Sequence, residues 1–189
     1  DCEDKALAAL WLPKIATGEA IVAVAQPTSP LVGDVHIADL VIARSGDSLY
    51  AIPTSEVTAT AQLSNDPSQK LSTIEFTPSS EWKMASGEAA DRLEAMALDR
   101  GALACAAQQL GACDQLITMS VEYTSQRKQF GVPIGSFQAV KHMCAEMAAR
   151  HEPCRSLVWY AAHAFDSIPE DASIFACHAK SHTGEAHRF

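Results

Sequence analysis

Apolar and polar residues follow different patterns in the two halves of the chain. In the first half, short runs rich in β-branched residues are separated by Gly, Pro, Asn and Asp, a pattern typical of strands and turns. The runs predicted to form strands are 21–25, 39–44, 48–52, 57–63 and 72–76. The tetrapeptide Ser45-Gly-Asp-Ser48 lies between two of these runs and predicts a hairpin.

Helical patterns dominate the second half. Beyond Pro78 the composition shifts to Ala, Leu, Met, Gln and Glu, and apolar residues recur at helical spacing. Three long helices are predicted, over 89–126, 134–165 and 172–189. Pro153 falls inside the second pattern, so we expect a kink near Ala149–Arg150.

A shorter helical pattern opens the chain at 5–15 and is expected to stop at Pro13 and Gly18. Strands followed by helices indicate an α+β fold, with a small antiparallel β domain followed by an up-and-down helical bundle. We expect a helical segment and linker at 1–20, a reduced β domain at 21–80 and an incomplete helical bundle at 81–189.

The formal net charge of -9 argues against nucleic acid and anionic membrane as partners, because both attract clustered Lys and Arg. No apolar run approaches the roughly 20 residues of a membrane span, and the acidic start at Asp1 is unlike a signal peptide. We therefore expect a soluble, cytoplasmic protein. The six cysteines are scattered, which favours reduced core residues over a disulfide framework.

The stretch from Tyr123 to Gln138 gathers a cation, amides and aromatic rings around one turn between helices. Arg127 offers a rigid guanidinium fork for a phosphate, Gln129 and Gln138 offer amides, and Phe130 offers a flat apolar face. This combination suits a dinucleotide. The alternative is an ordinary corner between helices, with a solvated Arg127 and a packed Phe130.

The same stretch resembles the Arg-x-x-Phe-Gly-x-x-Ile-x-x-x-Gln signature of the flavin-dependent acyl-CoA dehydrogenases, with every named position filled. The resemblance implies FAD as the cofactor and a clamp that contacts FAD bound mainly by a neighbouring subunit. The residues that the resemblance assigns to this clamp are Arg127, Gln129, Phe130, Ile134, Phe137 and Gln138. Members of the family are roughly twice this length, so the chain looks like an internal piece.

The substrate side matches the family less well. Asp99 stands where many members have an acidic residue that contacts the substrate, but Ala102 replaces the usual Arg. Arg100 would point away from position 102 on a helix and is better interpreted as a solvated charge. Gly101 occupies the position where a minority of members place the catalytic Glu. No catalytic base is identified in this sequence.

The flavin-side motif of the β domain is also altered. Ala25-Gln-Pro-Thr-Ser-Pro30 stands where many members have Thr-Glu-Pro-x-x-Gly-Ser-Asp. Thr28 and Ser29 could still donate hydrogen bonds to a flavin ring, although a plain turn bounded by prolines is favoured.

Cys177, His178, His182 and His187 are candidate metal ligands, because His178 and His182 share a helix face at i, i+4. No Glu follows His178 as the metalloprotease pattern requires, so an ordinary polar helix face is favoured and no metal is predicted. Neither a Gly-x-Ser-x-Gly elbow nor a Gly-x-Gly-x-x-Gly motif is present.

The resemblance implies a subunit of an enzyme that oxidises an acyl-CoA thioester to the α,β-enoyl-CoA and passes electrons to an electron-transfer acceptor. Its closest likeness is to members that act on bulky thioesters such as steroid side-chain esters, which often assemble as dimers of dimers. The chain is therefore expected to work in a homo- or hetero-oligomer. The alternative is a non-catalytic partner subunit that completes the flavin site of a companion.

Overall fold

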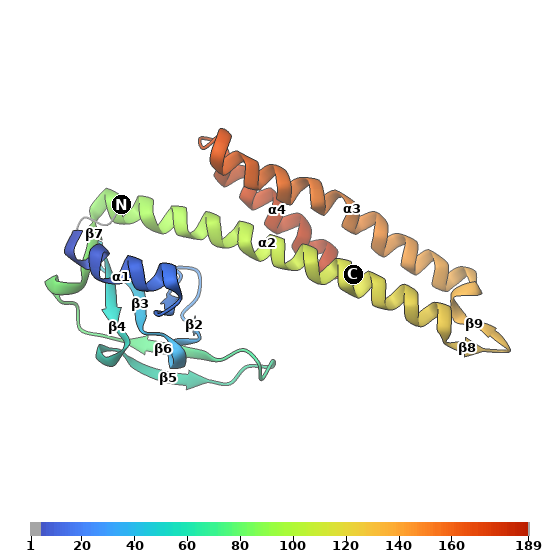
Figure 1. The fold of residues 1–189 in the computed structure, drawn as a ribbon, viewed down its shortest axis with the longest axis horizontal. Coiled ribbons are helices and arrows are strands. Elements are labelled where there is room, and N and C mark those ends of the chain that lie inside the picture. The colour runs from blue at the N-terminus through green and yellow to red at the C-terminus, as the bar shows by residue number, and fades with distance from the viewer. Residues whose placement is uncertain (1–4, 189) are drawn as a thin grey trace. The chain divides into compact units, whose positions relative to one another are not determined.

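A computed structural model describes residues 5–188 and shows two compact units, which divide after Ala95. The first unit carries the two larger sheets, and the second is mostly helical (Figure 1). The predicted α+β class is confirmed. The division falls inside a long helix, and the three-part domain boundaries expected from the sequence stay a prediction.

The first unit contains two small sheets. The four-stranded sheet has the order β1 (Val22–Val24), β3 (Leu40–Ser45), β4 (Ser48–Pro53) and β7 (Lys83–Ser86). The three-stranded sheet has the order β2 (Val32–Gly33), β6 (Leu71–Glu75) and β5 (Thr58–Gln62). Five of the strands lie where the sequence predicted them, while β2 and β7 were missed.

One strand pair departs from the predicted antiparallel arrangement, because β1 and β3 are parallel. The segment between them includes β2 and a 3₁₀ turn at Val35–Ile37, so the chain has the length to return and run in the same direction. The predicted hairpin at Ser45–Ser48 is confirmed. Gly46 has φ 60° at the first loop position, as a type II′ turn requires.

Large apolar side chains fill the core of the first unit. Those with at most 2% exposure are Val32, Val35, Leu40, Val41 and Ile52. An ion-pair cluster lies beside them, where the Arg44 guanidinium contacts Asp91 at 2.6 Å and Glu94 at 2.9 Å. These hydrogen bonds raise the pKa of Arg44 and connect β3 to the first turns of the following helix.

The first helix, α1 (Lys5–Thr17), runs through Pro13, so the expected stop at that proline was wrong. Proline leaves the carbonyl of Ala9 without its helical donor, but Ala9 is exposed and water can satisfy it. The helix ends before Gly18, which has φ 76°.

The helical unit is built from α2 (Gly87–Gln126), α3 (Gln138–Ser167) and α4 (Ala172–His187). In Figure 1, α2 and α3 lie side by side and are joined by a small hairpin at one end. The start of α3 differs from the predicted position 134, because Ile134–Ser136 forms a 3₁₀ turn (η4). The helix α3 continues past Pro153, and the expected kink there stays a prediction. Phe189, the predicted end of α4, lies outside the described residues.

Alanines form much of the core of the helical unit. Ala106 from α2, Ala161 from α3 and Ala179 from α4 belong to one buried cluster and have 0% exposure. The small side chains of Ala161 and Ala179 let the backbones of α3 and α4 approach closely, and Cys154 and Val158 belong to the same cluster. Burial raises the pKa of the Cys154 thiol, as it does for the buried Cys113.

A polar network joins α2 to α3 in the same unit. The Asp114 carboxylate lies 2.8 Å from Nε2 of His151 and accepts a hydrogen bond of 3.0 Å from Arg155. His151 is buried, and its other ring nitrogen has no hydrogen-bond partner among the described residues. The hydrogen bond to His151 and the charge of Arg155 lower the pKa of Asp114.

Replacing Asp114 by alanine is expected to destabilise the protein by about 1–3 kcal/mol at neutral pH, because the buried His151 loses its acceptor. Since the folded-state pKa of Asp114 is lowered, its contribution is present above the unfolded-state pKa and is lost as the pH falls through the folded-state pKa. In urea denaturation, the difference in unfolding free energy between Asp114→Ala and the unmodified protein should therefore shrink from neutral to acid pH. Asp166→Ala, at an exposed position on α3, is the control. A stability gap that does not narrow in acid would contradict this role.

Candidate functional site

The turn between α2 and α3 is a two-residue β-hairpin. Its strands are β8 (Lys128–Gln129) and β9 (Val132–Pro133), joined by Phe130 and Gly131. These two loop residues have φ values of 52° and 81°, as a type I′ turn requires at both positions. The hairpin therefore reverses the chain within a few residues of the end of α2.

Backbone contacts fix this hairpin to the helix ends. The amide of Arg127 donates to the carbonyl of Tyr123 at 2.8 Å, and the amide of Ile134 donates to the carbonyl of Arg127 at 2.8 Å. At Gly135 the backbone approaches α2 so closely that a Cβ there would lie 3.0 Å from the carbonyl oxygen of Thr124. The backbone of Arg127 is thus held by hydrogen bonds at both its amide and its carbonyl group.

Phe130 is unusual in two respects. A positive φ is uncommon for a bulky residue and costs on the order of 1–3 kcal/mol. Its side chain is also 92% exposed, with a single edge-to-face ring contact to Phe137 at 6.2 Å among the described residues. The packed Phe130 of the alternative interpretation is therefore not observed. Exposed aromatic rings and strained backbone positions are both frequent at binding sites.

The predicted clamp residues gather at this end of the helical unit. Arg127, Gln129 and Gln138 are exposed, Phe137 is 38% exposed, and Ile134 is half-buried. Within the part of the chain described, Arg127 forms no ion pair. A free guanidinium, two amides and an exposed ring are groups that can bind part of a dinucleotide.

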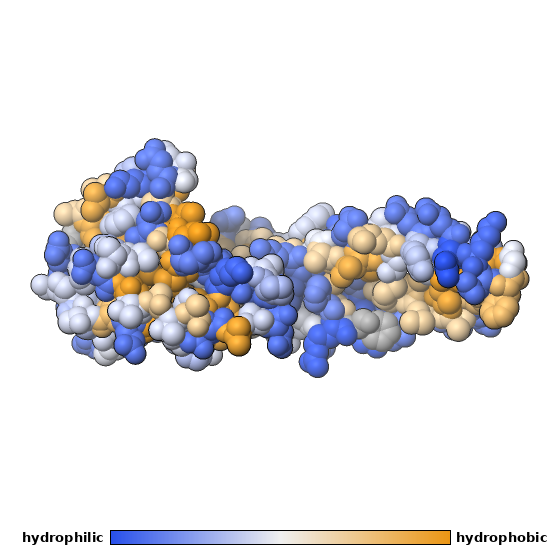
Figure 2. Space-filling model, turned by 90° about the horizontal axis from the view of Figure 1, so that it is seen from below, coloured by the Kyte–Doolittle hydropathy of each residue, from blue (hydrophilic) through white to orange (hydrophobic). Residues whose placement is uncertain are grey.

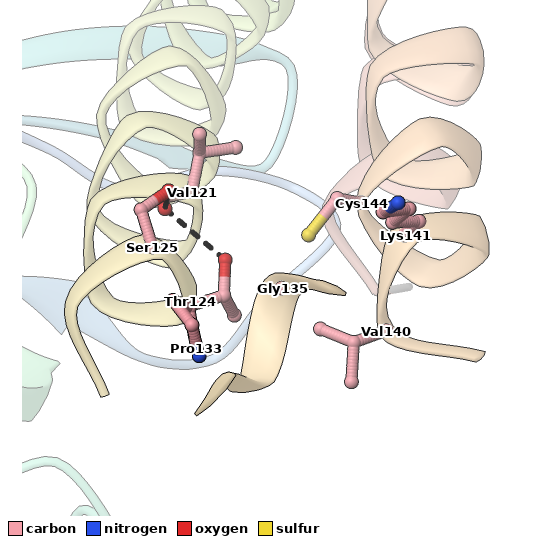
Figure 3. Close-up of a pocket in the computed structure, with 8 residues that line it drawn as sticks. All are labelled: Val121, Thr124, Ser125, Pro133, Gly135, Val140, Lys141 and Cys144. Carbon is pink, nitrogen blue, oxygen red and sulfur yellow. Dashed lines mark hydrogen bonds between the residues drawn. The ribbon is translucent and has the colours of Figure 1, made fainter. Parts of the chain in front are cut away.

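A pocket of about 420 Å³ lies behind the hairpin, between the end of α2 and the start of α3 (Figure 3). Thr124 and Ser125 of α2 and Cys144 of α3 line it, together with Pro133 and Gly135 of the turn. The hydroxyls of Thr124 and Ser125 donate to the carbonyl of Val121, so they serve the helix itself. None of the six predicted clamp residues is among its lining residues.

Asp99 lies on α2, where Ser173 of α4 donates a hydrogen bond of 3.1 Å to its carboxylate. This contact could not be seen in the sequence, because the two residues are 74 positions apart. Gly101 and Ala102 are half-buried on the same helix, and Arg100 is exposed. The expected substrate contact of Asp99 stays a prediction.

The segment in place of the flavin-side motif forms an exposed turn after β1. The hydroxyl of Ser29 accepts a hydrogen bond from the amide of Leu31 at 3.1 Å, and the amide of Ser29 donates to the carbonyl of Gln26 at 3.2 Å. Ser29 thus forms hydrogen bonds within its own turn, whereas Thr28 is exposed.

Two of the histidines on α4 lie at a surface pocket. His178 and His182 line a surface pocket of about 300 Å³ together with Leu157, Ser181 and Glu185. Over residues 5–188, no group of three or more His, Cys, Asp or Glu side chains is arranged to hold a metal ion. In the same range, no helix combines the length and apolar character needed to cross a membrane.

Comparisons with known proteins agree with the motif at the turn. Residues 92–189 match the model of the acyl-CoA dehydrogenase C-terminal domain. The chain is 33% identical over 154 residues to acyl-CoA dehydrogenase IpdE2 of Mycobacterium tuberculosis, covering 81% of this chain and 44% of that protein. It is 31% identical over 176 residues to IpdE2 of Mycolicibacterium smegmatis, covering 93% of this chain and 50% of that protein.

The chain therefore spans about half the length of these curated relatives. A solved structure of PigA with FAD and proline superposes with a TM-score of 0.85 at 21% identity, covering 98% of this chain and 59% of PigA, and so shares the fold. The match to the C-terminal domain extends over more than half of the sequence. The chain belongs to the acyl-CoA dehydrogenase family.

Proposed function

We propose that this chain is part of an FAD-dependent acyl-CoA dehydrogenase that acts in the cytoplasm and oxidises an acyl-CoA thioester to its α,β-enoyl-CoA. The observation that carries the proposal is the turn between α2 and α3, where Arg127 is free to bind a phosphate beside the exposed ring of Phe130. Family membership supplies the chemical context.

In this proposal the turn holds the pyrophosphate and adenine end of FAD bound by a neighbouring subunit. Arg127 binds the pyrophosphate through its guanidinium, and Gln129 and Gln138 donate and accept hydrogen bonds. Phe130, Phe137 and Ile134 supply the apolar face. When bound, FAD supplies the acceptor for the hydride from the β-carbon of the thioester.

The base that removes the α proton is not assigned to this chain. Gly101 has no carboxylate, and the contact with Ser173 places Asp99 in a hydrogen bond within the bundle. The proposed base therefore comes from a segment or subunit beyond these residues. Bulky thioesters such as steroid side-chain esters remain the proposed substrates, and an electron-transfer protein the proposed acceptor.

Exposed apolar residues on α2 and α3 support assembly with other subunits. On the right of the view in Figure 2, hydrophobic residues lie at the surface of the helical unit. The large ones at 45% exposure or more on these two helices are Leu116, Met119, Val121, Tyr123, Met143, Trp159 and Tyr160. We place the interface of an obligate oligomer on these helices, with more than about 2,000 Å² buried in total.

The second candidate is a non-catalytic partner subunit that completes a companion's flavin site. Gly101 and the locally bonded turn at Ser29 favour it, because both stand where the family has reactive or flavin-contacting groups. The two candidates differ in whether this chain itself contacts the acyl-CoA. A photoreactive acyl-CoA should label this chain of the assembled enzyme in the first case and only the companion in the second.

Purified by itself, this chain is expected to form no enoyl product from an acyl-CoA in the presence of a dye acceptor, because no base is identified in it. Product analysis by mass spectrometry checks this. The assembled protein with its full set of subunits is the positive control. Turnover by the chain alone would refute the assignment of the base to another segment or subunit.

A further inference from the structure

Strand β5 forms an open edge of the three-stranded sheet. Within the described residues it pairs with β6 on one side and with no strand on the other. All five residues, Thr58–Gln62, are exposed. Alternate residues of an antiparallel edge strand direct their N–H and C=O groups away from the sheet, so this edge offers a row of backbone hydrogen-bonding groups.

The usual features that prevent edge pairing are missing from this strand. Residues 57–65 contain no charged residue and no proline, in a chain whose net charge is -9. The register between β5 and β6 is continuous, whereas the β4–β7 pair shifts at Leu49–Tyr50. Two copies of this edge can therefore approach each other without like-charge repulsion.

The sequence of β5 is also nearly symmetric about Thr60. In an antiparallel pair with its own copy centred there, Thr60 faces Thr60, Ala59 faces Ala61, and Thr58 faces Gln62 of the second copy. Such Thr pairs stabilise neighbouring strands. Leu63, which follows the strand, is 103% exposed and adds an apolar side chain next to this edge.

Two other registers of the β5–β5 pair keep each side chain on the same face of the joined sheet, but they are less favourable. Centring the pair on Ala61 would pair only residues 60–62 with β5 of the second copy. Centring it on Ala59 would pair only residues 58–60 in this way. Only the register centred on Thr60 pairs all five residues of β5 with β5 of the second copy.

We propose that β5 is a homotypic interface, at which two copies of this chain join their three-stranded sheets through an antiparallel β5–β5 pair centred on Thr60. The partner is a second copy because the edge is uncharged and self-complementary. This interface involves no residue of the α2–α3 turn, so it stands independently of the proposed cofactor role.

Cysteine cross-linking tests the register. Opposed antiparallel residues have Cα atoms about 4.5–5.5 Å apart, within the range a disulfide spans. Thr60→Cys, in the assembled protein with Cys2 and Cys177 replaced by Ser, should give a reducible dimer on a non-reducing gel. Gln62→Cys is the matched control on the same strand, because the two introduced thiols would be about 13 Å apart along the paired strands. Equal cross-linking of both variants, or none in Thr60→Cys, would overturn the proposal.

Light scattering supplies a second measurement. Thr60→Lys places two like charges in direct opposition at the centre of the pair and should reduce the particle mass about twofold at equal concentration. Circular dichroism verifies that the exposed substitution leaves the fold intact. An unchanged mass would mean that β5 does not join two copies, including the case where a different protein occupies the edge.

Discussion

Replacing Arg127 by alanine is expected to weaken FAD retention by about tenfold or more in the assembled protein. A charge-assisted hydrogen bond to a phosphate contributes about 1.5–3 kcal/mol, and each 1.4 kcal/mol is about a tenfold change in affinity. Arg127 is free to make this contact because it forms no ion pair in the part of the chain described. The flavin content after gel filtration and a fluorescence titration with FAD measure the effect.

Lys128→Ala is the matched control for this experiment. Lys128 is the next residue along the hairpin and is also an exposed cation, but the family signature does not include it. It should retain flavin as the unmodified protein does. Equal flavin content in all three proteins would show that Arg127 does not bind the cofactor.

The second large effect concerns the core of the helical unit. Ala161 has 0% exposure and packs in the cluster that contains Ala106 and Ala179, so Ala161→Leu adds volume where no space exists. Overpacking of this kind costs about 1–3 kcal/mol, occasionally more. The midpoint of urea unfolding should fall accordingly, and thermal unfolding should shift by about 2–4 °C per kcal/mol.

Ala162→Leu gives a direct comparison, because the neighbouring residue on α3 is exposed. A surface substitution of this kind changes stability by about 0.5 kcal/mol or less. If the two leucine variants unfolded at the same urea concentration, the close approach of helices at Ala161 would be disproved.

The spacing of apolar residues predicted the long helices and most strands, because each of these elements is long enough for the spacing to be recognised. The parts that were missed are short or depend on distant contacts. β2 has two residues and β7 has four, too few to show a clear alternation. The parallel pairing of β1 with β3 depends on the path of the intervening segment, which carries no local signal.

At the site, the motif predicted which residues gather at the turn because they lie close together in the sequence. The type I′ geometry was not predictable from Phe130-Gly131, since such turns favour Asn or Gly at the first position. The contacts of Asp99 with Ser173 and of Asp114 with His151 were also unseen. Each joins helices through residues far apart in the chain.

The backbone of Phe130 has a consequence for attempts to engineer this protein. Selection for thermal stability alone would favour glycine or asparagine at this position, because either adopts the left-handed conformation more readily than phenylalanine. Such a screen would remove the exposed ring that the proposed cofactor contact needs. Thermostable variants of this chain should therefore be sought with position 130 held constant.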